Sequence, residues 1–412
     1  MYAIRTISIL GTLALCLSLS AQPASRCGSE LGWRQLSAEQ AAQRQRSLRT
    51  MEAWLASAET RKNELITIPV VVHIVYRTLT ENISDAQVYS QMEVLNQDFR
   101  ATNDNLGIVP LNFQGLISDT EIEFCLASVD PDGNPTTGIT RTQTPKDNIG
   151  WSSDVHYDNK DGKDAWDTQH YLNIWVADMG SNAGGRATFP GEAPPAEDGI
   201  VIDPRFFGTI GLAADSEPYH LGRTTVHEIG HYLNLEHVWG PGAPSCDVDD
   251  FVEDTPNSSK SYLQECPQEI QFTCGSTDMY TNYLYYTDDA CMAQFTPGQK
   301  NRMLATLYTV REGLRSGPGC QPIVGVAPEP QSEFRLELSP NPSDGPIQIC
   351  CVSPVPDDCH WQLYAATGQY LRSGRLTPNL PAYEYWPELP PGVYFFHLQQ
   401  SGRRLAKRLV IN

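Results

Sequence analysis

Residues 227–237 of the chain read His-Glu-Ile-Gly-His-Tyr-Leu-Asn-Leu-Glu-His. On an α-helix, His227 and His231 lie about 6 Å apart along the axis and on one face, so both imidazoles can reach a single metal ion. The chain must leave the helix after Asn234 to bring His237 to the same ion. Asparagine tolerates the left-handed backbone that such a turn requires. The stretch therefore predicts a helix whose end builds a site with three histidine ligands for one metal ion.

The composition of this site is that of a catalytic zinc centre. Three histidines leave one tetrahedral position open for water, and zinc lowers the pKa of that water to about 7. Glu228 lies beside the ligands and can take the proton from the water and pass it to a leaving amine. The predicted reaction is hydrolysis of a peptide bond. A chance His-Glu-x-x-His string on a surface helix is the alternative, and the third histidine argues against it.

The N-terminus has the pattern of an export signal. Arg5 precedes an apolar run from Ile7 to Leu19, and Ser20-Ala21 suits cleavage after Ala21. The run is too short for a membrane anchor, so we expect no transmembrane segment in the mature chain. Ten of the eleven cysteines follow the signal, because only Cys16 lies within it. In an exported chain they favour disulfides.

Length and charge narrow the class of protein further. A chain of 412 residues fits two or three domains. The formal net charge of −20 disfavours nucleic acid and anionic membrane surfaces as partners.

The chain divides into five predicted parts: an export signal (1–21), a pro-segment (22–62), a catalytic domain (63–320), a linker (321–332) and a C-terminal domain (333–412). The pro-segment is polar, with a helical pattern from Ser37 to Arg61, and a cut near Arg61-Lys62 would release it. In the catalytic domain, strands alternate with a helix capped by Ser84, which favours an α/β sheet. The predicted strands are Ile66–Tyr76, Ile122–Ala127, Tyr171–Ala177 and Gly199–Ile202.

Several motifs resemble the pappalysin (cytophagalysin) family of metzincin metalloproteases, over about residues 66–315. They are the zinc string, Ile68 to His73, Tyr171 to Trp175, Gly185 to Pro190, Asp250 to Pro256, and the segment from Asn282 through Cys291 to Gln299. The resemblance implies an α+β zincin domain with a twisted mixed sheet and an active-site helix. It also implies that the substrates are polypeptides.

The resemblance gives roles to residues after the zinc string. Leu284 replaces the methionine that forms an apolar floor beneath the zinc ligands, and by the same alignment Met292 is not that residue. A Leu/Met exchange in a packed site costs less than about 1.5 kcal/mol, so activity should survive. Tyr286 matches the family tyrosine whose hydroxyl stabilises the oxyanion. A core aromatic is the alternative for Tyr286.

The acidic loop that follows resembles the calcium-binding region of the family. Asp250, Asp254 and Thr255 offer the hard oxygen ligands that Ca²⁺ prefers, although a solvated acidic loop has the same composition. The resemblance also implies two crossed disulfides, Cys246–Cys274 and Cys266–Cys291. A further pair of Cys125 with Cys320 is open, because connectivity does not follow from sequence.

Two more residues have predicted roles in latency and specificity. A Cys27 thiolate, in Arg26-Cys27-Gly28, could occupy the open zinc position as in related cysteine-switch proenzymes, or Cys27 could be half of a disulfide. In metzincins the segment after Tyr286 lines the pocket for the side chain that follows the scissile bond. Here it holds Asp288 and Asp289, and Asp289 matches the family better. A carboxylate there would select arginine first and lysine second, unless both aspartates bind calcium or cap the turn.

The last eighty residues resemble the C-terminal sorting domain of the type IX secretion system. The motifs are Leu338 to Pro342, Tyr364 to Gly368, Leu389 to Phe395 and Lys407 to Asn412. Short strands between Pro and Gly turns suit a small all-β sandwich. The implied partner is the type IX machinery, which would carry the chain through the periplasm and outer membrane of a Bacteroidetes-type bacterium to the surface or medium. A substrate-binding β-domain is the alternative.

Together these features predict a secreted zinc metalloendopeptidase made as a preproenzyme. The competing class is a non-catalytic surface adhesin on a zincin scaffold, against which the presence of Glu228 argues.

Overall fold

The computed structural model describes residues 26–29, 36–57, 64–180 and 183–320, and from the C-terminal part 336–339, 347–351, 360–365, 369–375, 382–384, 389–400 and 403–411. The predicted export signal, the predicted linker and the predicted cut at Arg61-Lys62 lie outside these residues.

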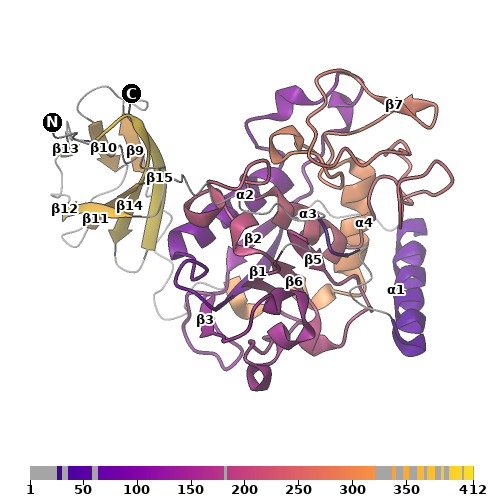
Figure 1. The fold of residues 1–412 in the computed structure, drawn as a ribbon, viewed down its shortest axis with the longest axis horizontal. Coiled ribbons are helices and arrows are strands. Elements are labelled where there is room, and N and C mark those ends of the chain that lie inside the picture. Colours follow the sequence, from indigo (N-terminus) through magenta and orange to yellow (C-terminus); the bar gives the residue numbers. More distant parts are fainter. Residues whose placement is uncertain are drawn as a thin grey trace, which may run out of the picture.

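A mixed sheet forms the centre of the catalytic region (Figure 1). Its long strand β1 (Ile66–Tyr76) is the β-branched run, buried along nearly its whole length. The first half of β1 pairs with β2 (Ile122–Leu126) and the second half with β3 (Ile139–Gln143), while β4 (Leu172–Ala177) lies on the other side. All of these pairs are parallel.

The edge of the sheet that carries β5 is short and ends in one antiparallel pair. β6 (Ile200–Ile202) runs parallel to β4, and β5 (Gly185–Ala187) runs antiparallel to β6. The predicted α/β domain with a mixed sheet is therefore confirmed. The sequence reasoning did not identify β3 or β5 as strands.

Helices cover the sheet and contribute residues to the predicted site. α2 (Asp85–Phe99) begins at Ser84, whose hydroxyl accepts a hydrogen bond from the Gln87 amide at 3.2 Å. α3 (Arg223–Tyr232) is buried at every position, and α4 (Pro297–Tyr308) begins with a capping box.

The helix of the predicted pro-segment is α1 (Ala38–Ala56), which is shorter than the pattern up to Arg61 suggested. It lies alongside α4 (Figure 1), and the rings of Trp54 and Tyr308 stack with centroids 5.5 Å apart. Met51 of α1 is buried at this contact.

In the C-terminal part, every element that the structure describes is a β-strand, as the predicted all-β domain requires. β9 (Leu336–Ser339), β10 (Ile347–Cys351) and β13 (Ala382–Glu384) form one antiparallel sheet. β11 (His360–Ala365), β12 (Tyr370–Arg375), β14 (Gly392–Gln400) and β15 (Arg403–Ile411) form a second. A short hairpin of β7 (Phe272–Thr273) and β8 (Ser276–Thr277) belongs to the disulfide-bonded loops before α4. Among the residues described, no helix combines the length and the apolar character that crossing a membrane requires.

Candidate active site

The end of α3 brings the three histidines together. His227 and His231 lie one turn apart on the helix, which ends at Tyr232, two residues before the predicted exit. Asn234 then adopts a left-handed backbone with φ of 72°, and the Leu235 amide donates to the Gly230 carbonyl at 2.9 Å. This turn returns His237 to the face of the helix that carries the other two ligands.

The spacing of the histidine nitrogens fits a zinc ion. The Nε2 atoms of His227, His231 and His237 lie 3.0, 3.1 and 3.2 Å from one another. A tetrahedral zinc with Zn–N bonds of about 2.0–2.1 Å would separate its nitrogens by roughly 3.3 Å. The three nitrogens therefore already stand near the positions that such an ion requires.

Hydrogen bonds on the far side of two rings set their tautomers. His227 Nδ1 lies 2.7 Å from the Tyr283 carbonyl, and His231 Nδ1 lies 2.7 Å from the Leu235 carbonyl. Because a carbonyl only accepts, each Nδ1 carries the proton and each Nε2 keeps its lone pair for a metal. Burial, followed by the neighbouring imidazoles, lowers the pKa of both rings well below the usual value. Both rings are thus neutral, as ligands must be.

Glu228 lies fully buried next to this cluster. Burial raises the pKa of its carboxyl to about 8, against hydrogen bonds from Cys27 and Ser29 that lower it. A Cβ on Gly185 would lie 2.8 Å from Glu228 Cγ, so only glycine lets β5 pass this close. A buried carboxyl with a raised pKa beside a metal site is typical of a general base.

The predicted latency residue lies at the histidines. The Cys27 sulfur and the three Nε2 atoms all lie within 4.8 Å of one another. Among the residues described, no disulfide includes Cys27. The segment is held on β5 by a parallel bridge between Cys27 and Gly185, in which the Gly28 amide donates to the Gly185 carbonyl at 2.7 Å. These four atoms are thus close enough together to hold one metal ion.

The neighbouring Arg26 fills the predicted specificity pocket. Its guanidinium forms a fully buried ion pair with Asp289, donates to the Thr287 carbonyl at 2.8 Å and lies 4.7 Å from the centre of the Tyr219 ring. Asp288, the second carboxylate of the segment, is partly exposed. The structure thus places an arginine on Asp289 while the adjacent Cys27 lies at the histidines.

Tyr286 and Leu284 also lie close to the histidine cluster. The Tyr286 ring lies 4.8 Å from the His237 ring and 5.7 Å from the His227 ring. Leu284 is fully buried, and a Cβ on Gly230 of α3 would lie 3.1 Å from Leu284 Cδ2. Leu284 is therefore packed against the zinc helix, at the place expected for the apolar floor.

The side chains of the three candidate calcium ligands make contacts in different places. The Thr255 hydroxyl donates to Asp250, with oxygen separations of 2.7 and 2.9 Å. Asp254 instead accepts from the Thr296 hydroxyl at 2.6 Å and the Gly298 amide at 2.8 Å, at the start of α4. Asp254 thus stabilises a helix N-terminus, a role that the sequence reasoning did not give it.

The disulfides in this region pair Cys246 with Cys274 and Cys266 with Cys291, as the family resemblance implied. Among the described residues, a further disulfide joins Cys125, near the end of β2, to Cys320.

The pro-segment helix contributes a second contact near the site. Arg44 forms ion pairs with Glu192 at 2.9 Å and Glu236 at 3.0 Å, and its guanidinium stacks on Phe189. Arg44, Ser29, His231 and His237 help to line a cavity of about 300 Å³. The sequence reasoning gave no role to Arg26, Ser29 or Arg44. The position of Arg26 next to Cys27 was the one available signal.

The sheet, the active-site helix and the histidine cluster define a metalloprotease of the zincin type, and comparisons with known proteins agree. A family model described as pregnancy-associated plasma protein-A, of the peptidase M43 family, matches residues 156–308. An extracellular metalloprotease of Arthroderma benhamiae is 31% identical over 253 residues, which are 60% of this chain and 80% of the relative. A protein with the same description from Arthroderma otae is 29% identical over the same shares.

Two solved structures from Tannerella forsythia are also similar. A mutant of promirolysin is 40% identical with a TM-score of 0.64, covering 71% of this chain and 97% of that one. Mature mirolysin in complex with a cleaved peptide is 43% identical with a TM-score of 0.59, covering 61% and 96%. The chain belongs to the pappalysin-like peptidase M43 family and is a metalloendopeptidase. The enzyme prediction is thereby confirmed over the adhesin, and the metal expected for this family is zinc.

Proposed function

We propose that the chain is a secreted zinc metalloendopeptidase, made as a latent proenzyme, that cleaves polypeptides before arginine. One observation carries the proposal: Arg26 occupies the Asp289 pocket while the adjacent Cys27 lies at the three histidines. Polypeptide substrates fit the relative mirolysin, whose structure holds a cleaved peptide.

The residues of the site divide the chemistry as follows. His227, His231 and His237 would hold a zinc ion, which would supply Lewis-acid chemistry at the carbonyl and at water. Glu228 accepts the proton of the attacking water and returns it to the nitrogen of the leaving amine. Tyr286, beside His237, donates a hydrogen bond to the carbonyl oxygen as it becomes negative.

The preference for arginine follows from the chemistry of Asp289. Its carboxylate is fully buried and in the proenzyme pairs with a guanidinium. A substrate arginine after the scissile bond can form the same charge-assisted pair, whereas lysine offers a single ammonium and an apolar side chain leaves the carboxylate unpaired. We therefore expect arginine first, lysine second and apolar residues last.

Latency follows from the same contacts. The pro-segment, residues 22–62, excludes substrate by placing Arg26 in the pocket, Cys27 at the histidines and α1 against α4. The parallel bridge between Cys27 and Gly185 anchors this part of the segment on β5. A cut near Arg61-Lys62 would free the catalytic domain, residues 63–320.

Export of the chain has separate support. The signal pattern of residues 1–21 and the extracellular relatives support secretion. The two antiparallel sheets within residues 333–412, after the linker 321–332, suit a sorting domain for the type IX machinery. We propose that this domain directs the chain across the outer membrane.

Calcium is proposed at the loop that contains Asp250, Asp254 and Thr255. Burial raises the pKa of the Asp250 carboxyl to about 8, and a cation would compensate the negative charge that burial disfavours. Thermal unfolding with and without calcium, for wild type and Asp250→Asn, tests this. A melting temperature that ignores calcium would remove the ion from the proposal.

The decisive experiment replaces Glu228. Glu228→Ala and the isosteric Glu228→Gln should retain zinc, because the three histidines are unchanged. Proteolysis should fall by about a thousandfold or more, since the base that activates water is lost. Metal analysis and a casein assay measure the two quantities. Residual activity within about tenfold of wild type would overturn the role of Glu228.

Specificity has its own measurement. Fragments of a mixed peptide library are sequenced after digestion by wild type and by Asp289→Ala. Wild type should cut before arginine, and the variant should lose that preference. Apolar residues after the wild-type cut, or an unchanged basic preference in the variant, would refute the assignment of the pocket.

A further inference from the structure

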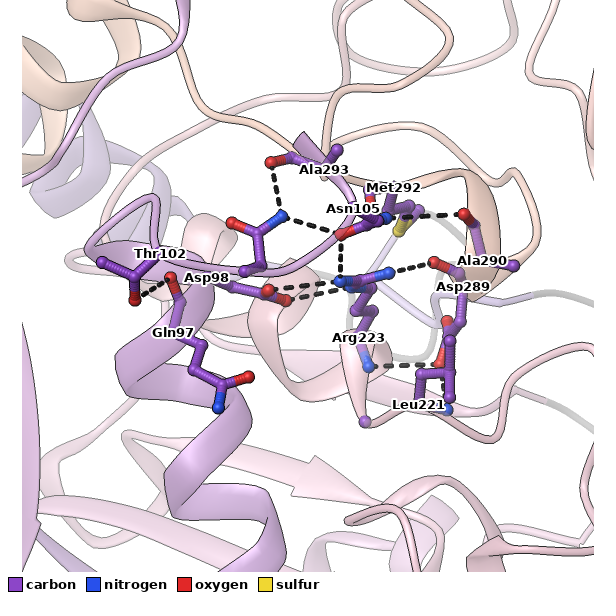
Figure 2. Close-up of polar contacts among 12 residues, drawn as sticks. Gln97, Asp98, Thr102, Asn105, Leu221, Arg223, Asp289, Ala290, Met292 and Ala293 are labelled. Atoms are coloured by element: carbon purple, nitrogen blue, oxygen red, sulfur yellow. Dashed lines mark hydrogen bonds and ion pairs between the residues drawn. The ribbon is translucent and has the colours of Figure 1, made fainter. Parts of the chain in front are cut away.

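A largely buried polar network holds the main chain around Asp289 (Figure 2). Its centre is Arg223, the first residue of the zinc helix α3. Arg223 donates to both oxygens of Asp98, at 3.1 and 3.3 Å, and to the backbone carbonyl of Asp289 at 2.6 Å. One guanidinium thus joins the C-terminal turn of α2, the start of α3 and the loop of the pocket.

Two asparagines extend the network along that loop. Asn105 accepts from Arg223 at 2.8 Å and donates to the Met292 carbonyl at 2.8 Å. Asn103 donates to Asn105 at 2.8 Å and to the Ala293 carbonyl at 3.1 Å. The carbonyls of the pocket loop are therefore bound by side chains from outside the loop, as the dashed lines of Figure 2 show.

The carboxylate of Asp289 is oriented from the same place. Its Oδ2 accepts from the Leu221 amide at 2.8 Å and the Arg223 amide at 3.2 Å, which leaves Oδ1 for the guanidinium of Arg26. Arg223 precedes His227 by four residues, one helical turn. Arg223, which binds the pocket loop, therefore lies at a fixed helical spacing from the predicted metal ligand His227.

We infer that Arg223 and Asp98 are positioning residues that set the distance between the pocket carboxylate and the metal site. Neither residue touches the substrate in this role, which rests on the proposed function of Asp289. Charge-assisted hydrogen bonds to arginine depend steeply on geometry, so a small shift of Asp289 reduces the selection of arginine more than it reduces hydrolysis.

The surroundings allow such a shift. A cavity of about 340 Å³ adjoins the network and is lined by Asp98, Asn105, Leu221, Arg223 and Ala290, among others. Ala290 of the pocket loop is exposed and borders this space, so a shorter side chain at position 223 would let this part of the loop relax toward it. The guanidinium therefore restrains the loop at the Asp289 carbonyl, next to this space.

The test compares two quenched fluorescent peptides that differ only in arginine or leucine after the scissile bond. Each variant is expressed as the full chain, activated by processing and loaded with zinc. Arg223→Met and Asp98→Asn should lower the ratio of kcat/KM between the arginine and leucine peptides by about tenfold, while kcat/KM for the leucine peptide changes by less than about threefold. Arg223→Lys should recover part of the ratio, because lysine keeps the charge without the fork.

Two controls make the result specific. Asp85 lies on α2, like Asp98, and forms an exposed ion pair with Arg141 of β3. Asp85→Asn removes this ion pair and should leave the ratio unchanged. Asp289→Ala should abolish the ratio. If Asp289→Ala keeps it, the proposed pocket is wrong. If Asp289→Ala abolishes it while the Arg223 and Asp98 variants keep it, or lose activity equally on both peptides, the positioning role is wrong.

Discussion

At the residue scale, substitutions of Leu284 test whether this side chain stabilises the metal site by packing. It is fully buried against Gly230 of the zinc helix. Leu284→Met should cost less than about 1.5 kcal/mol of unfolding free energy, because the volume is nearly conserved. Leu284→Ala should cost about 2–5 kcal/mol, since it leaves a cavity beneath α3. Urea unfolding measures both, and equal losses for the two variants would contradict a packing role.

His73 predicts a second property, the loss of stability in acid. Burial lowers the pKa of this β1 residue from 6.5 to about 4, and its two nitrogens lie 2.8 Å from Thr140 Oγ1 and 3.0 Å from Asn173 Oδ1. The unfolded chain takes up a proton near pH 6.5, whereas the folded chain does so only near pH 4. The free energy of unfolding should therefore fall between these pH values, by roughly 3 kcal/mol in total from this residue.

The comparison that isolates this effect uses His73→Gln and, as a control, His170→Gln at a partly exposed position. Urea unfolding is followed at several pH values from 7.5 to about 4. The difference between wild type and His73→Gln should shrink as the pH falls, whereas His170→Gln should follow wild type. A difference that does not depend on pH would show that His73 contributes packing alone.

Local spacing explains which site residues could be predicted. The zinc ligands lie within one helix and its turn, so their geometry follows from the helical repeat and from Asn234. The ion pair of Arg26 and Asp289 joins residues 263 positions apart, and that of Asp98 and Arg223 joins residues 125 apart. No local pattern links such residues, and only the tertiary fold brings them together.

At the scale of elements, strands with a strong local sequence pattern could be predicted, whereas strands that depend on tertiary contacts could not. β1 was predictable because a buried strand with neighbours on both sides needs a long β-branched run. β5 is three residues, Gly185 to Ala187, and its glycine is required by the close approach of Glu228 rather than by strand propensity. β5 is a strand because it pairs with β6 and packs against Glu228, and neither contact is visible in the local sequence.

The pro-segment gives the prediction that belongs to this scale. Arg26 and Cys27 are two linked anchors, so losing either should weaken occupation of the cleft by more than its own contact. We expect uncleaved Cys27→Ala and Arg26→Ala proenzymes to hydrolyse a peptide at least about tenfold faster than the wild-type proenzyme. Peptide hydrolysis before processing measures this.

The control for latency is Arg46→Ala, on an exposed position of α1. It should remain as latent as wild type. A folded Cys27→Ala proenzyme without activity would count against the thiolate as a zinc ligand, and the Arg26→Ala result would then show whether the pocket alone maintains latency.

At the scale of the whole molecule, the catalytic region ends with a covalent bond. The Cys125–Cys320 disulfide joins β2 to the last described residue before the predicted linker. A native disulfide of this loop length contributes on the order of 2–5 kcal/mol to stability. The disulfide supports our proposal that the protease domain ends at Cys320 and that the β-sheets that follow form a separate domain.

A pair of truncations tests this boundary together with the sorting role. A chain that ends at Pro330 keeps Cys320 and should fold and cleave peptides like wild type, but it should remain in the periplasm of its native host because it lacks the sorting domain. A chain that ends at Gly319 loses the disulfide and should melt at a lower temperature. Thermal unfolding, peptide hydrolysis and cell fractionation measure the three properties. Surface delivery of the Pro330 truncation would refute the sorting role. Loss of folding in that truncation would instead show that the C-terminal sheets stabilise the protease.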